Sequence, residues 1–320
     1  MICTTKDWEI NEIFSLYKDN IKVNVVEPKE KPEGLEFLIN ANWNMILEER
    51  ITKQNSPREE FRFEPYKKYN KKTEYNSLYH KENLLIWPGF VSRLENYNYT
   101  ALKMFKKSEL TLDVSQITFP EVLAVKNPAY FYYFKDNKVP SAPLAVDVLV
   151  ISSDDYITLS KRGNNTPFYP GAYHVFGGNI ELAGTHPVEE MSRELFEELG
   201  ILEEEHFDID SIEVNALSND KLFMWRQDKW ENPKTWKVRK PELHARIRVN
   251  LSKDEINKIF NDKKKKELDA QSIHFIKYNE NSLRETIKKF NLTRPCEVSL
   301  FLELSKITNI KPEELLSEIY

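Results

Sequence analysis

Four glutamates spaced three or four residues apart surround one arginine in a short stretch of the chain. They are Glu190, Glu194, Glu197 and Glu198, and the arginine is Arg193. On a helix, residues at this spacing gather on one side, where like charges repel each other by roughly a few tenths of a kcal/mol per pair. Carboxylate oxygens are also the ligands that hard divalent cations prefer. The stretch is therefore either a solvated acidic face or a cation site.

Two adjacent glycines, Gly177 and Gly178, precede the acidic stretch and follow an apolar segment, residues 173–176. Glycine has no Cβ, so a loop with two glycines lets the backbone come close to a ligand. The glycine pair therefore favours the cation site and predicts that both glycines lie at a substrate.

A helix is predicted from Val188 to Leu199 as the element that positions the glutamates. Its apolar residues recur at helical spacing and form one stripe: Val188, Met191, Leu195 and Leu199. Pro187 suits the first turn of a helix, and Gly200 suits its end. The stripe predicts a helix that packs on a core and presents its glutamates on another side.

The run from Arg193 to Ile201 resembles the second half of the Nudix box, whose pattern is G, five residues, E, seven residues, then R-E-U-x-E-E-x-G-U with U a bulky aliphatic residue. Every specified position of that half matches. The resemblance implies that Glu194, Glu197 and Glu198 bind Mg²⁺ or Mn²⁺ and act in catalysis.

The first half of the box departs from the pattern. Counting back from the arginine, the box glutamate falls at Thr185 and the box glycine at Asn179. The chain therefore has either a one-residue insertion between Glu181 and Val188 or a degenerate front to the box.

In the family, the missing glutamate helps to hold the arginine. Arg193 is expected to find another partner here, Glu189 or Glu190. Its implied role is to fix the helix against the glycine loop, without touching the substrate.

The resemblance also implies an α/β fold, a Nudix-type α/β/α sandwich around a mixed β-sheet over residues 136–320. Residues 1–135 would form an α+β amino-terminal extension. In the Nudix-type part, strands are predicted at residues 144–152, 156–160, 207–217, 221–225, 242–250 and 272–278, with helices at 252–260, 281–290 and 295–307. In the extension, strands are predicted at residues 22–26, 83–87, 99–105 and 109–114, with helices at 35–53 and 119–125.

The extension resembles that of Nudix hydrolases which act on nucleoside-diphosphate sugars. The resemblance rests on the order of a helix with Trp43, then Phe61-Arg62-Phe63, then strands ending in Leu110-Thr111-Leu112, then residues 118–123. The alternative is an unrelated extension that packs on the Nudix domain or forms a dimer.

Four other residues are candidates for the site. Arg162 ends a predicted strand, where it could clamp a phosphate or belong to plain surface. Glu267 precedes the last predicted strand, on a loop where many family members place an acidic base or metal ligand, and Glu181 is a further acidic candidate. His244 could serve as a base, although a lone histidine in a strand more often lies in a wall with its hydrogen bonds satisfied.

Composition narrows the class of protein. A net charge of −5 argues against a general nucleic-acid binder. Nothing in the sequence approaches the length of apolar run that spans a membrane. Cys3 and Cys296 are far apart, without metal-ligand spacing, which predicts a cytoplasmic protein without a disulfide framework. The oligomeric state cannot be predicted.

The function implied is a metal-dependent hydrolase that cleaves the diphosphate linkage of a nucleoside diphosphate derivative, with nucleotide sugars as one substrate class. Two alternatives stay open. The chain could be a catalytically degenerate Nudix-fold protein that binds nucleotides or regulates another protein, or it could hydrolyse ADP-ribose or dinucleotides. The motif does not encode the choice of base.

Overall fold

The structure is a computed structural model of the 320-residue chain. It describes residues 2–5, 7–28, 37, 39, 41, 90–102, 107–118, 121–122, 143–164, 169–220, 240–264 and 270–320. The predicted elements at 83–87 and 221–225, the segment Phe61–Phe63 and the candidate Glu267 lie outside these residues, as do most of the predicted helices at 35–53 and 119–125.

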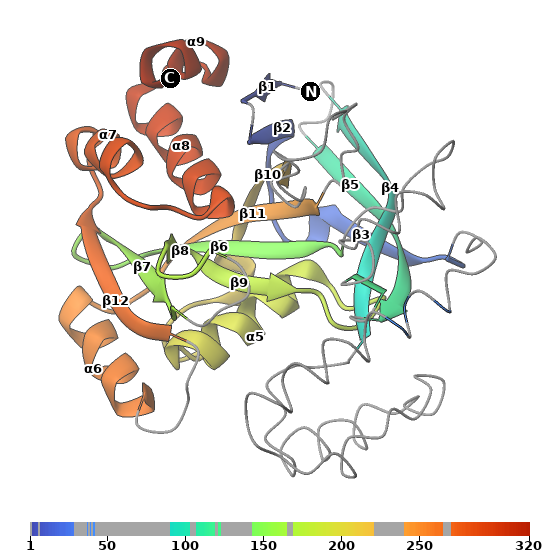
Figure 1. Cartoon of the computed structure of the whole chain (residues 1–320), viewed down its shortest axis with the longest axis horizontal. Helices are drawn as coiled ribbons and strands as arrows, with labels where there is room; N and C mark the ends of the chain where they lie inside the picture. Colours follow the sequence, from blue (N-terminus) through green and yellow to red (C-terminus); the bar gives the residue numbers. More distant parts are fainter. Residues whose placement is uncertain are drawn as a thin grey trace.

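The described strands form two sheets, and the larger sheet is mixed (Figure 1). Its order is β1-β2-β10-β11-β6-β7-β12, with β8 paired to β7 and β9 paired to β6. The bounds are β1 Cys3–Thr4, β2 Trp8–Leu16, β6 Ala145–Ile151, β7 Tyr156–Arg162, β8 Tyr173–His174, β9 Phe176–Asn179, β10 Glu213–Asp220, β11 Lys240–Arg248 and β12 Ala270–Lys277. Strands β6 and β11 are parallel, whereas β10 is antiparallel to β11 and β7 is antiparallel to both β6 and β12.

Helices cover both faces of this sheet (Figure 1). Helices α5 (Pro187–Leu199) and α6 (Lys253–Lys264) lie on one face, and α7 (Glu280–Lys289), α8 (Arg294–Thr308) and α9 (Pro312–Ile319) lie on the other. Strand β6 shows why two cores form. Val146 and Val148 pack into the core that includes α5, whereas Leu149 and Ile151 pack into the core that includes α8. The expected α/β/α sandwich around a mixed sheet is therefore confirmed.

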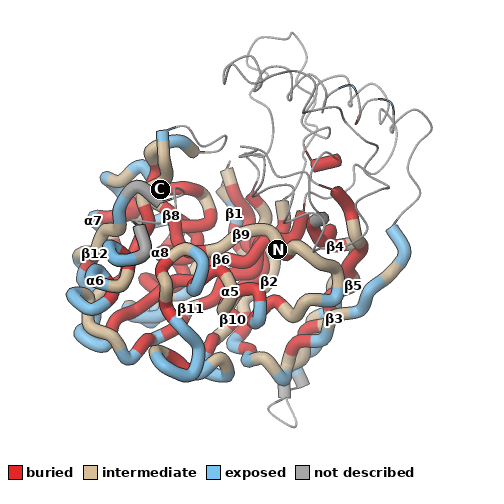
Figure 2. The backbone as a smooth tube through the Cα atoms, turned by 90° about the horizontal axis from the view of Figure 1, so that it is seen from below, coloured by how far each residue is buried: buried red, intermediate tan, exposed pale blue. Residues whose placement is uncertain are grey.

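The smaller sheet has the order β3-β5-β4, with β3 Ile21–Val25, β4 Phe90–Leu102 and β5 Lys107–Thr118. Leu110, Leu112 and Val114 of β5 are buried in the same core as α5. Figure 2 shows that buried residues run through this sheet as well as the larger one. The predicted strands at 22–26 and 109–114 are confirmed, and so is the described part of the strand at 99–105, although β4 begins well before residue 99.

Strands β1 and β2 were not expected, and they belong to the larger sheet. Strand β2 pairs antiparallel with β10, and Trp8 is buried against Phe301 of α8, with their ring centroids 5.5 Å apart. Strands from both sides of residue 135 thus share one sheet. The division into an extension and a Nudix-type domain stays a prediction.

Candidate functional site

Helix α5 has local signals at both ends. The imidazole Nδ1 of His186 accepts a hydrogen bond from the Val188 amide at 3.2 Å, Pro187 follows in the first turn, and Gly200 ends the helix with a φ of 79°. The apolar stripe faces the core, because Val188, Met191, Leu195 and Leu199 are all fully buried. The glutamates are therefore held on the side predicted from the sequence.

The glycine pair of β9 leaves room for the helix carboxylates. A Cβ on Gly177 would lie 2.0 Å from the carbonyl oxygen of Val146 on the neighbouring strand. A Cβ on Gly178 would lie 2.5 Å from Oε1 of Glu194. Neither position tolerates a side chain without movement, so the Glu194 carboxylate lies directly against the backbone of β9.

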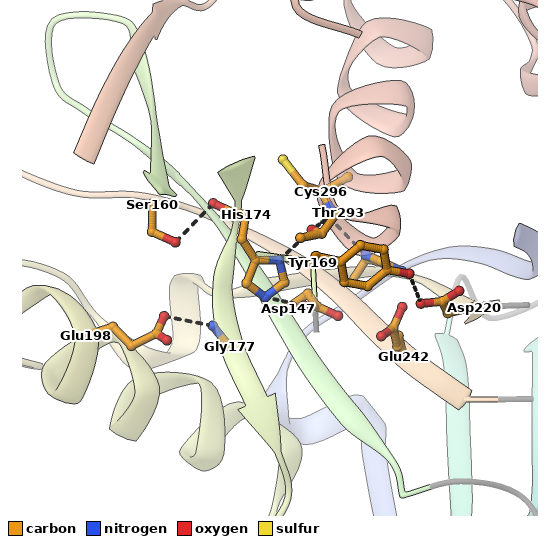
Figure 3. Close-up of polar contacts among 12 residues, drawn as sticks. Asp147, Ser160, Tyr169, His174, Gly177, Glu198, Asp220, Glu242, Thr293 and Cys296 are labelled. Carbon is orange, nitrogen blue, oxygen red and sulfur yellow. Dashed lines mark hydrogen bonds and ion pairs between the residues drawn. The ribbon is translucent and has the colours of Figure 1, made fainter. Parts of the chain in front are cut away.

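Glu198 reaches the same backbone. Its Oε2 accepts a hydrogen bond from the Gly177 amide at 3.2 Å (Figure 3). Burial, and then the charge of Glu198, raise the pKa of Glu194 well above its ordinary value. Two carboxylates thus lie close together at the glycine pair. A bound cation would offset both the cost of burying their charges and the repulsion between them.

Arg193 binds several of the glutamates on its own helix. Its guanidinium donates to Glu190 at 2.7 Å, to Glu194 at 2.5 Å and, by a short hydrogen bond, to Glu197. Burial opposes its charge, but the hydrogen bond to Glu190 and the negative charges of Glu194 and Glu190 raise the pKa of Arg193. The expected pairing with Glu190 is confirmed.

The departure at Thr185 is partly offset by another carboxylate. Glu181, in the loop between β9 and α5, lies with Oε1 3.9 Å from the Arg193 guanidinium. Glu189 does not pair with the arginine but with Lys18, whose Nζ lies 3.1 Å away. Arg193 therefore sits among carboxylates from both the loop and the helix.

The loop in front of α5 is held by the smaller sheet. Gln116 of β5 donates through Nε2 to the Glu181 carbonyl at 3.0 Å and accepts from the Ala183 amide through Oε1 at 2.8 Å. The Nε2 of His186 lies 3.1 Å from the Ile21 carbonyl. Residues far away in the sequence thus fix the loop that departs from the Nudix box.

A second polar cluster lies on the α8 face of the sheet. Ligand-type atoms of Asp147, Glu242 and His244 all lie within 4.8 Å of one another. The ring nitrogens of His244 lie 2.7 Å from Ser218 Oγ and 3.0 Å from Ser299 Oγ. Burial, and then the charge of Lys240, lower the pKa of His244 to about 3. The reading of His244 as a buried wall residue with satisfied hydrogen bonds is confirmed.

Asp147 has charged neighbours on several strands. Burial raises the pKa of Asp147 to about 7, with Lys240 and Arg162 acting to lower it and Asp220 acting to raise it. His174 Nε2 lies 3.8 Å from its Oδ1 (Figure 3). Burial lowers the pKa of His174, and Arg162 lowers it further. The charge of Arg162 therefore acts on both Asp147 and His174.

Two strand positions connect the clusters. Asp147 of β6 is the register partner of Gly177 of β9, so the second cluster begins one strand away from the glycine pair. Asp147 was not among the site residues predicted from the sequence. The available signal was one carboxylate inside an otherwise apolar strand, AVDVLVI, since a charged residue is almost never fully buried unless it is paired.

The described helices are all too short or too polar to cross a membrane.

No protein-family model matches the chain, and no curated protein matches it. Among solved structures, the neighbours include Nudix and MutT proteins. A MutT/nudix family protein from Enterococcus faecalis is 15% identical, with a TM-score of 0.33, over 59% of this chain and 74% of that one.

Two other neighbours were solved with nucleotides. The NUDIX domain of Shewanella oneidensis NrtR, complexed with ADP ribose, is 13% identical with a TM-score of 0.32, over 56% of this chain and 97% of that one. A bifunctional NMN adenylyltransferase/ADP ribose pyrophosphatase from Francisella tularensis, complexed with AMP and a Mn ion, is 15% identical with a TM-score of 0.33, over 59% of this chain and 49% of that one. At these identities the function of this chain must be argued from its own residues.

Proposed function

We propose that the chain is a Nudix-type hydrolase that cleaves the diphosphate linkage of a nucleoside diphosphate derivative with the help of a divalent cation. The observation that carries the proposal is the meeting of Glu194 and Glu198 at the glycine pair. Glu194 lies against Gly178, and Glu198 accepts a hydrogen bond from the amide of Gly177.

The residues present suit Mg²⁺ or Mn²⁺. Glu194, Glu197 and Glu198 offer carboxylate oxygens only, which is the donor set that these hard cations take. Burial, and then the charge of Glu198, raise the pKa of Glu194 even with Arg193 in contact, and a nearby cation would favour the charged form of this carboxylate. When bound, the ion would supply positive charge to stabilise the charge that develops on the diphosphate oxygens.

The residues of the chain would position that chemistry. The hydrogen bond from Gly177 fixes the Glu198 carboxylate, and the absence of a side chain at Gly178 leaves the space that the Glu194 carboxylate occupies against the backbone. Arg193 ties Glu190 to Glu194 and so holds the helix side chains in one arrangement. A neighbouring carboxylate then takes the proton from the attacking water.

The substrate class is tested by a panel of UDP-sugars, ADP-ribose, dinucleotides and nucleoside triphosphates, each with Mg²⁺ and with Mn²⁺. We expect metal-dependent release of a nucleoside monophosphate from at least one diphosphate. No release from any member of the panel would contradict the proposal. Nucleotide sugars are one candidate class, because of the resemblance of the amino-terminal part, and ADP-ribose and dinucleotides are others.

One observation favours a second candidate, a nucleotide-binding protein without hydrolysis. Arg193 donates hydrogen bonds to Glu194 and to Glu197, two of the three proposed metal ligands. An arginine on those carboxylates can take the place of the cation. Calorimetry with ADP-ribose and UDP-glucose separates the candidates, since this reading predicts nucleotide binding that needs no divalent ion and yields no product.

A further inference from the structure

Three side chains of metal-binding type converge from two paired strands on the α8 face of the larger sheet. Asp147 lies on β6, and His244 is its register partner on the parallel strand β11. Glu242 lies two residues before His244, so its side chain leaves β11 on the same face. Their ligand atoms lie within 4.8 Å of one another. The geometry is set by the sheet rather than by a loop.

The group is buried and incompletely satisfied. The exposed fractions of Asp147, Glu242 and His244 are 2%, 1% and 0%. Within the described chain, Oδ2 of Asp147 has no hydrogen-bond partner. An apolar interior accepts a carboxylate only when a cation or several donors compensate its charge. One carboxylate oxygen of Asp147 is therefore buried without the donor that burial demands.

The protein's own cations compensate only part of the charge. Lys240 Nζ lies 2.6 Å from Oε1 of Glu242 and supplies one positive charge to it. The charge of Arg162 acts on Asp147, but so does the opposing charge of Asp220. Even with both cations present, Oδ2 of Asp147 remains without a donor among the described residues.

We infer that Asp147, Glu242 and His244 form a binding site for a divalent first-row transition metal of the Zn²⁺ type, separate from the α5 glutamates. One imidazole nitrogen with two carboxylate oxygens suits Zn²⁺, whereas Mg²⁺ and Ca²⁺ take oxygen ligands. One ring nitrogen of His244 would give up its hydrogen bond to a serine and bind the ion instead. The other nitrogen keeps its serine, Ser218 or Ser299, which fixes the orientation of the ring.

The test is calorimetric titration of Zn²⁺ into the metal-free, full-length chain carrying Glu198→Gln, which weakens binding at α5. We expect one tight Zn²⁺ per chain. Adding Asp147→Asn should weaken that binding by more than the roughly 10- to 100-fold that the loss of an outer-shell partner costs, because it removes a ligand charge with little change of shape. The matched control is Glu303→Gln, which alters a carboxylate of α8 that is equally buried but bonded to Arg246. It should leave the Zn²⁺ affinity unchanged.

Absence of tight Zn²⁺ binding in the Glu198→Gln chain, or unchanged binding after Asp147→Asn, overturns the inference. A second measurement needs no change at the proposed site, so it holds even if Asp147→Asn fails to fold. Co²⁺ bound to the Glu198→Gln chain should give a strongly shifted, exchangeable imidazole N–H proton in the NMR spectrum, from His244. A spectrum without such a signal overturns the inference, and neither result depends on hydrolase activity.

Discussion

At the scale of single residues, Glu198 is the side chain that connects the acidic helix to the glycine pair. Glu198→Gln keeps the shape but removes a charge from the proposed cation site. We expect a loss of roughly a hundredfold or more in kcat/KM, because several kcal/mol of charge stabilisation in the transition state would be lost. The measurement is Mg²⁺-dependent turnover of the best substrate in the panel, with circular dichroism to confirm the fold.

Glu189→Gln is the matched control, since Glu189 is exposed on the same helix and pairs with Lys18 rather than with the glycine pair. It should keep near wild-type turnover. Equal losses in the two variants would show that the α5 carboxylates act through the general charge of the helix and not as cation ligands.

The two cysteines should be slow to react in the folded protein. Burial, and then the charge of Glu313, raise the pKa of Cys3 from 9.0 to about 11, and burial raises the pKa of Cys296 well above its ordinary value. Raising the pKa of a thiol from 9 to about 11 lowers its thiolate fraction roughly a hundredfold at neutral pH. Labelling with Ellman's reagent should be slow in native protein and rapid in guanidinium. Fast labelling of native protein would contradict the burial of both thiols.

At the scale of elements, α5 is anchored by its apolar stripe. Met191 is fully buried, so Met191→Ala should lower the free energy of unfolding by about 2–5 kcal/mol. Phe196→Ala on the same helix removes a larger side chain that is 49% exposed, and it should cost less. Urea denaturation of both variants checks the order, and a larger loss for Phe196→Ala would show that the helix is rotated.

Helix α5 could be predicted from the sequence because its signals are local. The apolar spacing, Pro187 and Gly200 all lie within the helix or next to it. The hydrogen bonds that hold the loop before the helix could not be predicted, because Gln116 contacts Glu181 and Ala183 from 65 and 67 positions away. Nothing in either stretch alone indicates the other.

The cluster of Asp147, Glu242 and His244 could not be predicted from the sequence for a similar reason. Asp147 and His244 are brought together only by the pairing of β6 with β11. Strand β2 was missed because its alternation of apolar and polar residues breaks at Asn11 and Glu12, two polar residues in succession, and its partner β10 is distant. Local periodicity therefore predicted the elements with one clear apolar face and missed those that depend on pairing.

At the scale of the whole molecule, the amino terminus completes the core beneath α8. Trp8 is 1% exposed, and its ring lies 5.5 Å from that of Phe301 and 6.2 Å from that of Tyr320. Trp8→Ala should lower the stability of the entire chain by about 3–5 kcal/mol. One cooperative transition at lower temperature is expected in calorimetry. A separate early transition would show instead that the amino terminus unfolds on its own.

A chain that begins near Pro140 lacks β2, so it leaves β10 unpaired on one side and uncovers the surface that Trp8 occupies. Unpaired strand edges and exposed apolar patches promote aggregation. We expect this shortened chain to be insoluble. If it is instead a soluble monomer with the same kcat/KM as the full chain, the amino-terminal part has no role in either folding or substrate selection.

The pairing of β2 with β10 also bears on how the chain is made. The side chain of Asn219 donates a hydrogen bond to Asn11, which is 208 positions earlier. During synthesis, β2 leaves the ribosome long before its partner strand exists. Contacts between residues so far apart slow folding, because the entropy of closing the loop is lost before the contact can form. Strand β2 is thus made early but is among the last strands to be secured, and until then it is a segment for chaperones to shield.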